Sequence, residues 1–361
     1  MNSAIRSTLR RMAVLSSISL LIFLLGLNSG LVERFYTNGL YQFTSVAQRF
    51  ISSFFPFAIG DFLYVIFIIY CLWVAFKFIK QLLNADERKD ARFTVSLKLV
   101  NFLLILYIVF KILWGLNYSR PSITGRLGLS NEKYTAKELL SLADFLITRT
   151  NEIEAKLETQ KLKRKYTIRE LQAGAKTSYD QLAKVNPFFK YQIPAVKPVL
   201  FSWAITKIGL EGYYNPLSGE ANLNMRLPGT VLPFTTCHEI SHELAVARED
   251  EANLIGYLVS INSADLNFQY SGYYNILRSV LFEIRFKSPE DTPRLYKKIN
   301  KATLADFKAE RDFWMKYNSD MFGYMDVALD SFLKINNQQK GTDSYQDIVL
   351  WVYNLHRKEL K

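Results

Sequence analysis

One short stretch of the sequence has residue types and spacing suited to hydrolytic chemistry. It reads His238-Glu239-Ile240-Ser241-His242 and contains two of the three histidines in the 361-residue chain. On an α-helix, residues four apart share one face, so both imidazoles can reach a single Zn²⁺ while Glu239 lies beside the metal. The His-Glu-x-x-His pattern therefore predicts a zinc site in which His238 and His242 are ligands and Glu239 is the general base.

A catalytic zinc site needs a third protein ligand and leaves its fourth position to water. The remaining histidine, His356, lies far downstream, so a carboxylate from the segment 249–251 is the better candidate. In a helix over 249–260, Glu251 points the same way as the apolar residues that follow it, and a buried carboxylate needs a partner such as a metal. We therefore predict Glu251 as the third ligand, with Glu249 and Asp250 as acids of the first helical turn.

This choice requires the chain to turn after the second histidine. An unbroken helix would place His242 and Glu251 about 13 Å apart on opposite faces. The turn must fall between Leu244 and Glu249, where the sequence has neither Gly nor Pro.

Two further roles at the site are assigned from the sequence. Asn253 is predicted to orient an imidazole through a hydrogen bond, because metal-bound histidines usually donate their second N–H to a partner. Tyr270 or Tyr273 is predicted to supply the donor that stabilises an oxyanion, since so few histidines are present.

The elements that position this site begin with a membrane domain over 1–117. Long apolar runs predict three transmembrane helices, at about 12–28, 60–79 and 95–116. The first run could instead be a signal peptide, although Asn28-Ser29-Gly30 is a poor cleavage site. The rest of the topology is the same under either interpretation.

The distribution of basic residues predicts the orientation. Arg6, Arg10 and Arg11 precede the first span, and five more basic residues lie around the second connection: Lys77, Lys80, Arg88, Lys89 and Arg92. The positive-inside rule then places the N-terminus in the cytoplasm and the C-terminal domain outside it, at a bacterial inner membrane. More than half of the net charge of +12 lies before residue 118, so it reflects topology and does not indicate nucleic-acid binding.

The remainder is predicted to be a linker over 118–134 and a mainly helical soluble domain over 135–361. Capping boxes at Thr135 and Thr167 predict two helix starts. Strand-like segments at 199–203, 205–214 and 221–227 predict a small antiparallel sheet, which would make this an α+β domain. The strand before the metal helix could be an edge to which a peptide adds, or part of a sheet that only covers the helix.

Taken together, the motifs resemble those of zincin metallopeptidases of the gluzincin kind, in which two histidines of His-Glu-x-x-His and a downstream glutamate hold zinc. Three N-terminal spans, the segment 114–118 (Trp-Gly-Leu-Asn-Tyr), the segment 249–253 (Glu-Asp-Glu-Ala-Asn) and the segment 270–273 (Tyr-Ser-Gly-Tyr) also resemble an uncharacterised family of bacterial membrane proteins, known as a domain of unknown function. The resemblance implies a zincin-like fold and Glu251 as a ligand. Relatives tend to have Gly soon after the second histidine, where this chain has Leu244 and Ala245.

Two functional hypotheses follow. The first is a membrane-anchored zinc metallopeptidase that cleaves protein or peptide substrates close to membrane lipid. The second is a non-catalytic membrane sensor or binding module that keeps zinc for structure. Glu239 favours the first, because a structural zinc site has no need of a general base. The metal helix is too polar to lie in lipid, which argues against an intramembrane protease.

Overall fold

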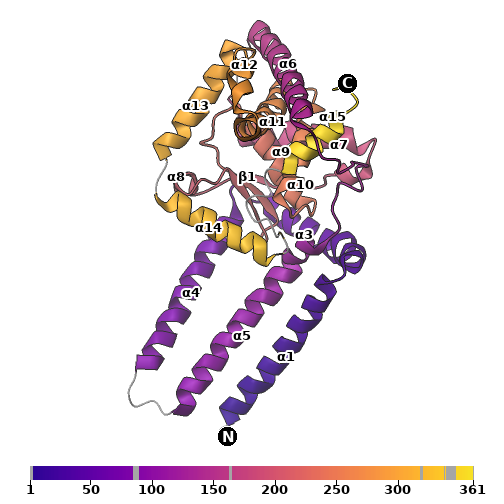
Figure 1. The fold of residues 1–361 in the computed structure, drawn as a ribbon. Helices are drawn as coiled ribbons and strands as arrows, with labels where there is room; N and C mark the ends of the chain where they lie inside the picture. The colour runs from indigo at the N-terminus through magenta and orange to yellow at the C-terminus, as the bar shows by residue number, and fades with distance from the viewer. Residues whose placement is uncertain are drawn as a thin grey trace.

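Three long apolar helices extend from one side of a folded body in the computed structural model (Figure 1). The structure describes residues 3–83, 89–161, 165–317, 320–336, 338 and 347–360. The three helices are α1 (Ser3–Gly26), α4 (Ile59–Leu83) and α5 (Lys89–Leu113). Each contains a stretch long and apolar enough to cross a membrane, at Ile5–Gly26, Ile59–Gln81 and Phe93–Leu113, as predicted. Arg88, one of the residues used to predict orientation, lies outside the described residues.

Between the first two apolar helices, the chain folds back against the body. This connection consists of α2 (Ser29–Leu31), the π-helix η1 (Val32–Leu40) and α3 (Tyr41–Ser53). Tyr36, Tyr41 and Arg49 from it are buried. The connection is thus part of the folded structure around the site.

The two predicted capping boxes are present. α6 (Ala136–Gln160) starts after Thr135, and α7 (Ile168–Ala183) starts after Thr167; both caps bond reciprocally with a glutamate three residues later. This exchange satisfies two backbone N–H groups that would otherwise lack partners at a helix start. Both helices pack their apolar faces onto the core of the body.

A small sheet lies next to these helices. Its strands are β1 (Val196–Pro198), β2 (Gly212–Asn215) and β3 (Glu220–Leu223), in the order β1-β3-β2. β1 runs parallel to β3 and β2 antiparallel, so the sheet is mixed and the prediction of an antiparallel sheet is wrong. Part of the predicted strand region is the helix α8 (Ser202–Lys207), because a short apolar run does not distinguish a strand from a helical turn.

The metal-motif helix is the centre of the body. α9 (Leu232–Glu243) is followed by α10 (Glu249–Ile261) and α11 (Leu266–Lys287), and these three helices pack on one another. All 12 residues of α9 are buried. α9 also packs against β2, β3 and α7.

The remaining elements complete the body. Along the chain they are η2 (Gly115–Ser119), η3 (Pro187–Phe189), η4 (Pro289–Asp291), α12 (Thr292–Tyr296), α13 (Lys301–Tyr317), α14 (Asp320–Ile335) and α15 (Asp347–His356). α15 packs onto α10, α11 and α6. α14 lies across the ends of α4 and α5, where these helices meet the body (Figure 1).

Candidate metal centre

The turn required after the second histidine is present. α9 ends at Glu243, and Ala245 adopts a left-handed backbone with φ of 67°. The N–H of Ala245 donates to the carbonyl of His242 (2.9 Å), and the N–H of Val246 donates to the carbonyl of Ser241 (3.2 Å). This is the hydrogen-bond pattern of a Schellman motif, in which glycine is the usual left-handed residue. Alanine fills that position here, which is why the sequence did not reveal the turn.

The turn brings the first residue of α10 back to the two histidines. One carboxylate oxygen of Glu249, Oε2, lies 3.2 Å from His238 Nε2 and 3.7 Å from His242 Nε2. Candidate ligand atoms of these three residues all lie within 4.8 Å of one another. Tetrahedral ligands about 2.1 Å from a zinc ion are separated by about 3.4 Å, so the two distances to Glu249 are compatible with one ion bound between these side chains.

The structure corrects the position predicted for Glu251. Its Oε1 accepts a hydrogen bond from the backbone N–H of Ile123 (3.2 Å) and lies 3.5 Å from Arg248. Arg120 adds a second nearby positive charge. The apolar stripe correctly predicted that Glu251 is buried, but its partners are cations and a backbone amide on the side away from the histidines. Glu249 is the acid beside the imidazoles.

Both imidazoles are oriented through their second nitrogen. Asn253 Oδ1 lies 2.9 Å from His238 Nδ1, in the position predicted for it, and the carbonyl of Val246 lies 2.6 Å from His242 Nδ1. Each acceptor favours the tautomer with its proton on Nδ1, which directs the lone pair of Nε2 towards Glu249.

The local charges favour a cation between the imidazoles. Burial lowers the pKa of His238, but the hydrogen bond with Glu249 and the charges of Glu239 and Glu249 outweigh burial and raise it to about 9. Burial lowers the pKa of His242. The carboxylates of Glu249 and Glu239 thus favour positive charge next to His238.

Glu239 lies beside this cluster in a tight space. It is buried, and among the described residues its Oε2 has no hydrogen-bond partner. Its Oε1 faces β2, where a Cβ added to Gly212 would come within 2.6 Å of it. Burial raises the pKa of Glu239 to about 8, so this carboxyl can exchange protons near neutral pH.

A cavity of about 990 Å³ opens at this cluster. Its lining includes Glu239, both histidines and Glu249, the segment 209–214 around β2, and aromatic residues from α4, α5 and η2. Tyr270 and Tyr273 point elsewhere: Tyr270 donates to Asp306 (2.6 Å), and Tyr273 packs on Tyr257. Tyr118 lines the cavity instead and lies close enough to Glu249 for that charge, after burial, to raise its pKa.

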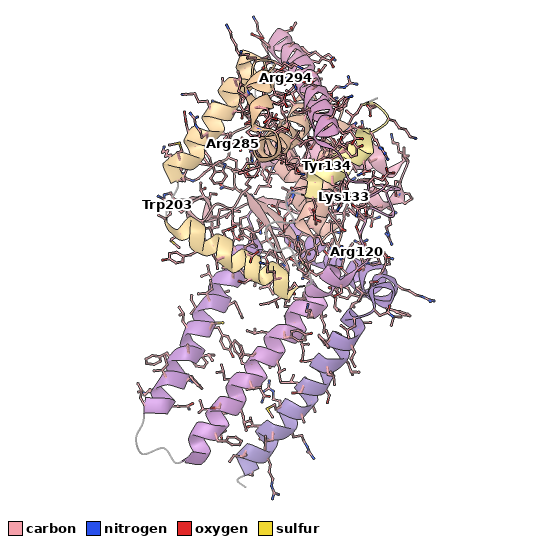
Figure 2. The ribbon with its side chains drawn as sticks, in the orientation of Figure 1. Arg120, Lys133, Tyr134, Trp203, Arg285 and Arg294 are labelled. Atoms are coloured by element: carbon pink, nitrogen blue, oxygen red, sulfur yellow. The ribbon has the colours of Figure 1, made fainter. Side chains whose placement is uncertain are left out.

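The segment predicted as a linker also contributes to the site. Arg120 is buried, and its Nη1 donates to the carbonyl of Ala245 (2.9 Å), the left-handed residue of the turn. Figure 2 shows Arg120 where the apolar helices meet the body. Ile123 is fully buried in the core next to Glu251. The sequence analysis predicted none of these contacts; Tyr118 from the neighbouring segment also lines the cavity.

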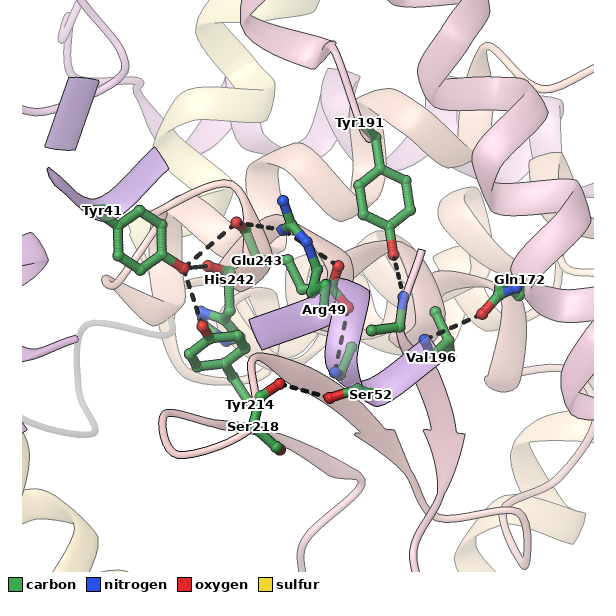
Figure 3. Close-up of polar contacts among 12 residues, drawn as sticks. Tyr41, Arg49, Ser52, Gln172, Tyr191, Val196, Tyr214, Ser218, His242 and Glu243 are labelled. Atoms are coloured by element: carbon green, nitrogen blue, oxygen red, sulfur yellow. Dashed lines mark hydrogen bonds and ion pairs between the residues drawn. The ribbon is translucent and has the colours of Figure 1, made fainter. Parts of the chain in front are cut away.

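The connection between the first two apolar helices holds the end of α9 (Figure 3). Arg49 Nη1 donates to the backbone carbonyl of Glu243 (2.9 Å) and lies 3.4 Å from its carboxylate. The Tyr41 hydroxyl donates to the carbonyl of His242 (3.2 Å) and lies 3.1 Å from the hydroxyl of Tyr214 on β2. A cation at a helix C-terminus is favourable, so α3 both caps α9 and fixes the residue that carries the second imidazole.

The comparisons with known proteins give one match. A family model described as "Protein of unknown function (DUF3810)" matches residues 36–353, which include α3, the whole candidate site and most of the body. No curated protein matches the chain. No solved structure matches it either.

Proposed function

We propose that this chain, which belongs to the family described as "Protein of unknown function (DUF3810)", is a membrane-anchored zinc-dependent metallopeptidase. The observation that carries the proposal is the convergence of His238, His242 and Glu249 on one point, with the buried Glu239 beside them. Two oriented imidazoles and a carboxylate form the donor set of many catalytic zinc sites, which leave one position for water. The order of a histidine-bearing helix, a turn and a glutamate-bearing helix supports a zincin-like arrangement.

The role of each side chain follows from its place. When bound, zinc would polarise the scissile carbonyl and lower the pKa of a coordinated water. Glu239, buried beside the cluster, is placed to take a proton from that water and pass it to the leaving amine, and the charge of a bound cation would favour its ionised form. Tyr118 replaces Tyr270 and Tyr273 as the candidate hydrogen-bond donor to an oxyanion, because it lines the cavity.

β2 is suited to hold an extended peptide. It is one of the two edge strands of the described sheet and pairs with β3 on one side, while its residues line the cavity. An extended chain can add to such an edge through main-chain hydrogen bonds. At Gly212 the absence of a side chain lets the strand approach Glu239 closely, which would bring a paired peptide bond next to the general base.

The proposed location follows from the charge pattern. The helices α1, α4 and α5 are long and apolar enough to anchor the protein, and the distribution of Lys and Arg supports a folded body on the extracytoplasmic side of a bacterial inner membrane. Substrates on that side would be proteins or peptides close to the membrane surface.

The test uses the full-length protein in lipid nanodiscs. Zinc content and cleavage of a fluorogenic peptide mixture are measured for the wild type and for Glu239→Gln. We expect about one zinc per chain in both proteins, and at least a 100-fold loss of cleavage in the variant. Zinc binding with no cleavage by either protein would favour the non-catalytic sensor, and no zinc binding would refute both functions.

The ligand assignment needs its own comparison. Glu249→Gln should weaken zinc affinity by at least 100-fold, measured by competition with a chelator, because it removes a charged donor from the cluster. Glu251→Gln is the matched control, two residues away on the same helix. It should change thermal stability more than zinc affinity, because its partners are Ile123 and Arg248. Equal losses of zinc affinity would contradict the assignment.

A further inference from the structure

The cavity at the candidate metal centre has a wall made by the apolar helices. Tyr64 on α4 and Phe110 on α5 line it, and both lie within the stretches that are apolar enough to cross a membrane. Because lipid surrounds such stretches, the cavity lies where the folded body meets the membrane. The opposite wall carries Glu239 and the histidines.

α14 closes part of this cavity with one edge of a broad apolar side. Met325 and Leu329, at that edge, line the cavity. Met321, Tyr324 and Ile335 continue the apolar side at helical spacing and have exposed fractions of 59%, 77% and 80%. The remaining side carries the ion pair Asp330–Lys334. A helix with an exposed apolar face and a charged face is typical of segments that lie in the membrane interface.

Contacts fix the end of α14 at the end of an apolar helix. Phe332 packs on Phe110, with ring centroids 5.8 Å apart. Lys111 Nζ donates to Asn336 Oδ1 (3.0 Å), just after α14 ends. Both contacts join α14 to the last residues of the stretch Phe93–Leu113, so the helix lies at the edge of the lipid layer.

A second exposed apolar segment lies at the start of α4. The backbone N–H of Leu200 donates to Asp61 Oδ2 (2.7 Å), which ties this segment to the start of that helix. Leu200, Phe201 and Trp203 are all exposed, and Figure 2 shows Trp203 on the side of the body from which α4 extends. Trp and other aromatic residues favour the membrane–water interface.

We propose that α14 and the segment 200–203 rest in the interfacial layer of the membrane, and that the substrate is a polypeptide held in the same layer by an apolar anchor. This inference rests on the proposed peptidase function and names its substrate class. The anchored chain enters the cavity past Met325 and Leu329 and reaches β2 and Glu239. Tethering to the same surface raises the effective concentration of such a chain at the cavity. A peptide in solution does not have this advantage.

The first experiment measures depth in the membrane, independently of activity. Full-length protein carrying Cys71→Ser is placed in phosphatidylethanolamine–phosphatidylglycerol vesicles; the remaining native cysteine, Cys237, is buried. A nitroxide label is attached at Tyr324→Cys or, as a matched control on the charged side of α14, at Asp330→Cys. We expect the label at 324 to collide more with oxygen than with a water-soluble nickel chelate, and the label at 330 to show the reverse. A water-exposed label at both positions would overturn the proposal.

The second experiment tests the substrate class by cross-linking, which does not require cleavage. p-Benzoylphenylalanine replaces Met325, or the exposed Phe286 as a control, and the probe is a decapeptide mixture with or without a palmitoyl chain. We expect at least a tenfold higher yield with the palmitoyl peptides at position 325 and no comparable gain at 286. Equal gains at both positions, or none at 325, would overturn the proposal. Cross-linking at 325 without cleavage by the wild type would refute the peptidase function alone.

Discussion

The pair Arg49–Glu243 offers a quantitative test of how the membrane-proximal segment supports the site. Arg49→Met removes the partner of a carboxylate whose side chain is fully buried, and also removes the hydrogen bond to the last carbonyl of α9. Loss of one partner of a buried ion pair costs about 3–5 kcal/mol. We expect a loss of about 3 kcal/mol of unfolding free energy. Burial raises the pKa of Glu243 to about 7 even beside Arg49, and removing Arg49 raises it further, so the loss should grow as the pH rises above 7.

The assay is thermal unfolding of the full-length protein in detergent. A loss of about 3 kcal/mol corresponds to a fall in Tm of about 6–12 °C for a domain of about 150–250 residues. The double variant Arg49→Met, Glu243→Gln removes the uncompensated charge, while the glutamine oxygen can still accept from the N–H of Ala221, as Glu243 Oε1 does (3.2 Å). It should therefore be more stable than Arg49→Met by about 1.5 kcal/mol.

The Tm values of Arg49→Met and of the double variant test two separate points. If the double variant is no more stable than Arg49→Met, then electrostatic pairing is not what holds α3 to the end of α9. If Arg49→Met leaves the Tm unchanged, the proposed support of the second histidine by α3 is refuted.

Other variants test the local geometry. Gly212→Ala should reduce cleavage at least tenfold without changing zinc content, because its Cβ would meet Glu239 Oε1 at 2.6 Å; unchanged cleavage would contradict the close approach. Ala245→Val should lower the Tm by several degrees, whereas Ala245→Gly should change it little, because a β-branched residue is strained at a φ of 67°. Thermal unfolding of both variants measures this, and equal Tm values would contradict the strain at this position. Asn253→Ala should weaken zinc affinity by about 10–100-fold with the fold intact. Zinc affinity is measured by chelator titration, and an unchanged value would contradict the role of Asn253. A fragment beginning at Asn117 should fail to bind zinc with full-length affinity, because it lacks α3; equal affinity would show that α3 is dispensable.

Local patterns in the sequence predicted several elements correctly. The apolar runs predicted three helices able to span a membrane, and the caps at Thr135 and Thr167 predicted two helix starts. These features depend on residues close together in the chain, which is why a single sequence reveals them.

Other features depend on partners that are distant in the sequence. The apolar stripe after Glu251 showed that this acid is buried, but not that Ile123 and Arg120 surround it. Glu249 looked like an ordinary first-turn acid, and only the turn at Ala245 brings it to the histidines. No local pattern could predict a turn that uses alanine where glycine is usual.

The sheet illustrates the same limit. The residues of α8 are apolar and β-branched enough to suggest a strand. The run is too short for its hydrophobic pattern to distinguish a strand from a helix. The parallel pairing of β1 with β3 likewise depends on how the intervening chain packs, because β1 and β3 are not consecutive strands.

The contacts that Arg49 and Tyr41 of α3 make with the end of α9 have a consequence for biogenesis. Arg49 is synthesised 194 residues before Glu243 and Tyr41 201 residues before His242, and both lie between the first two hydrophobic helices. Nascent chains would thread those helices into the bilayer before the ribosome reaches the histidine motif. Insertion of those helices would therefore precede the contacts between α3 and α9, and the candidate site would be completed only afterwards.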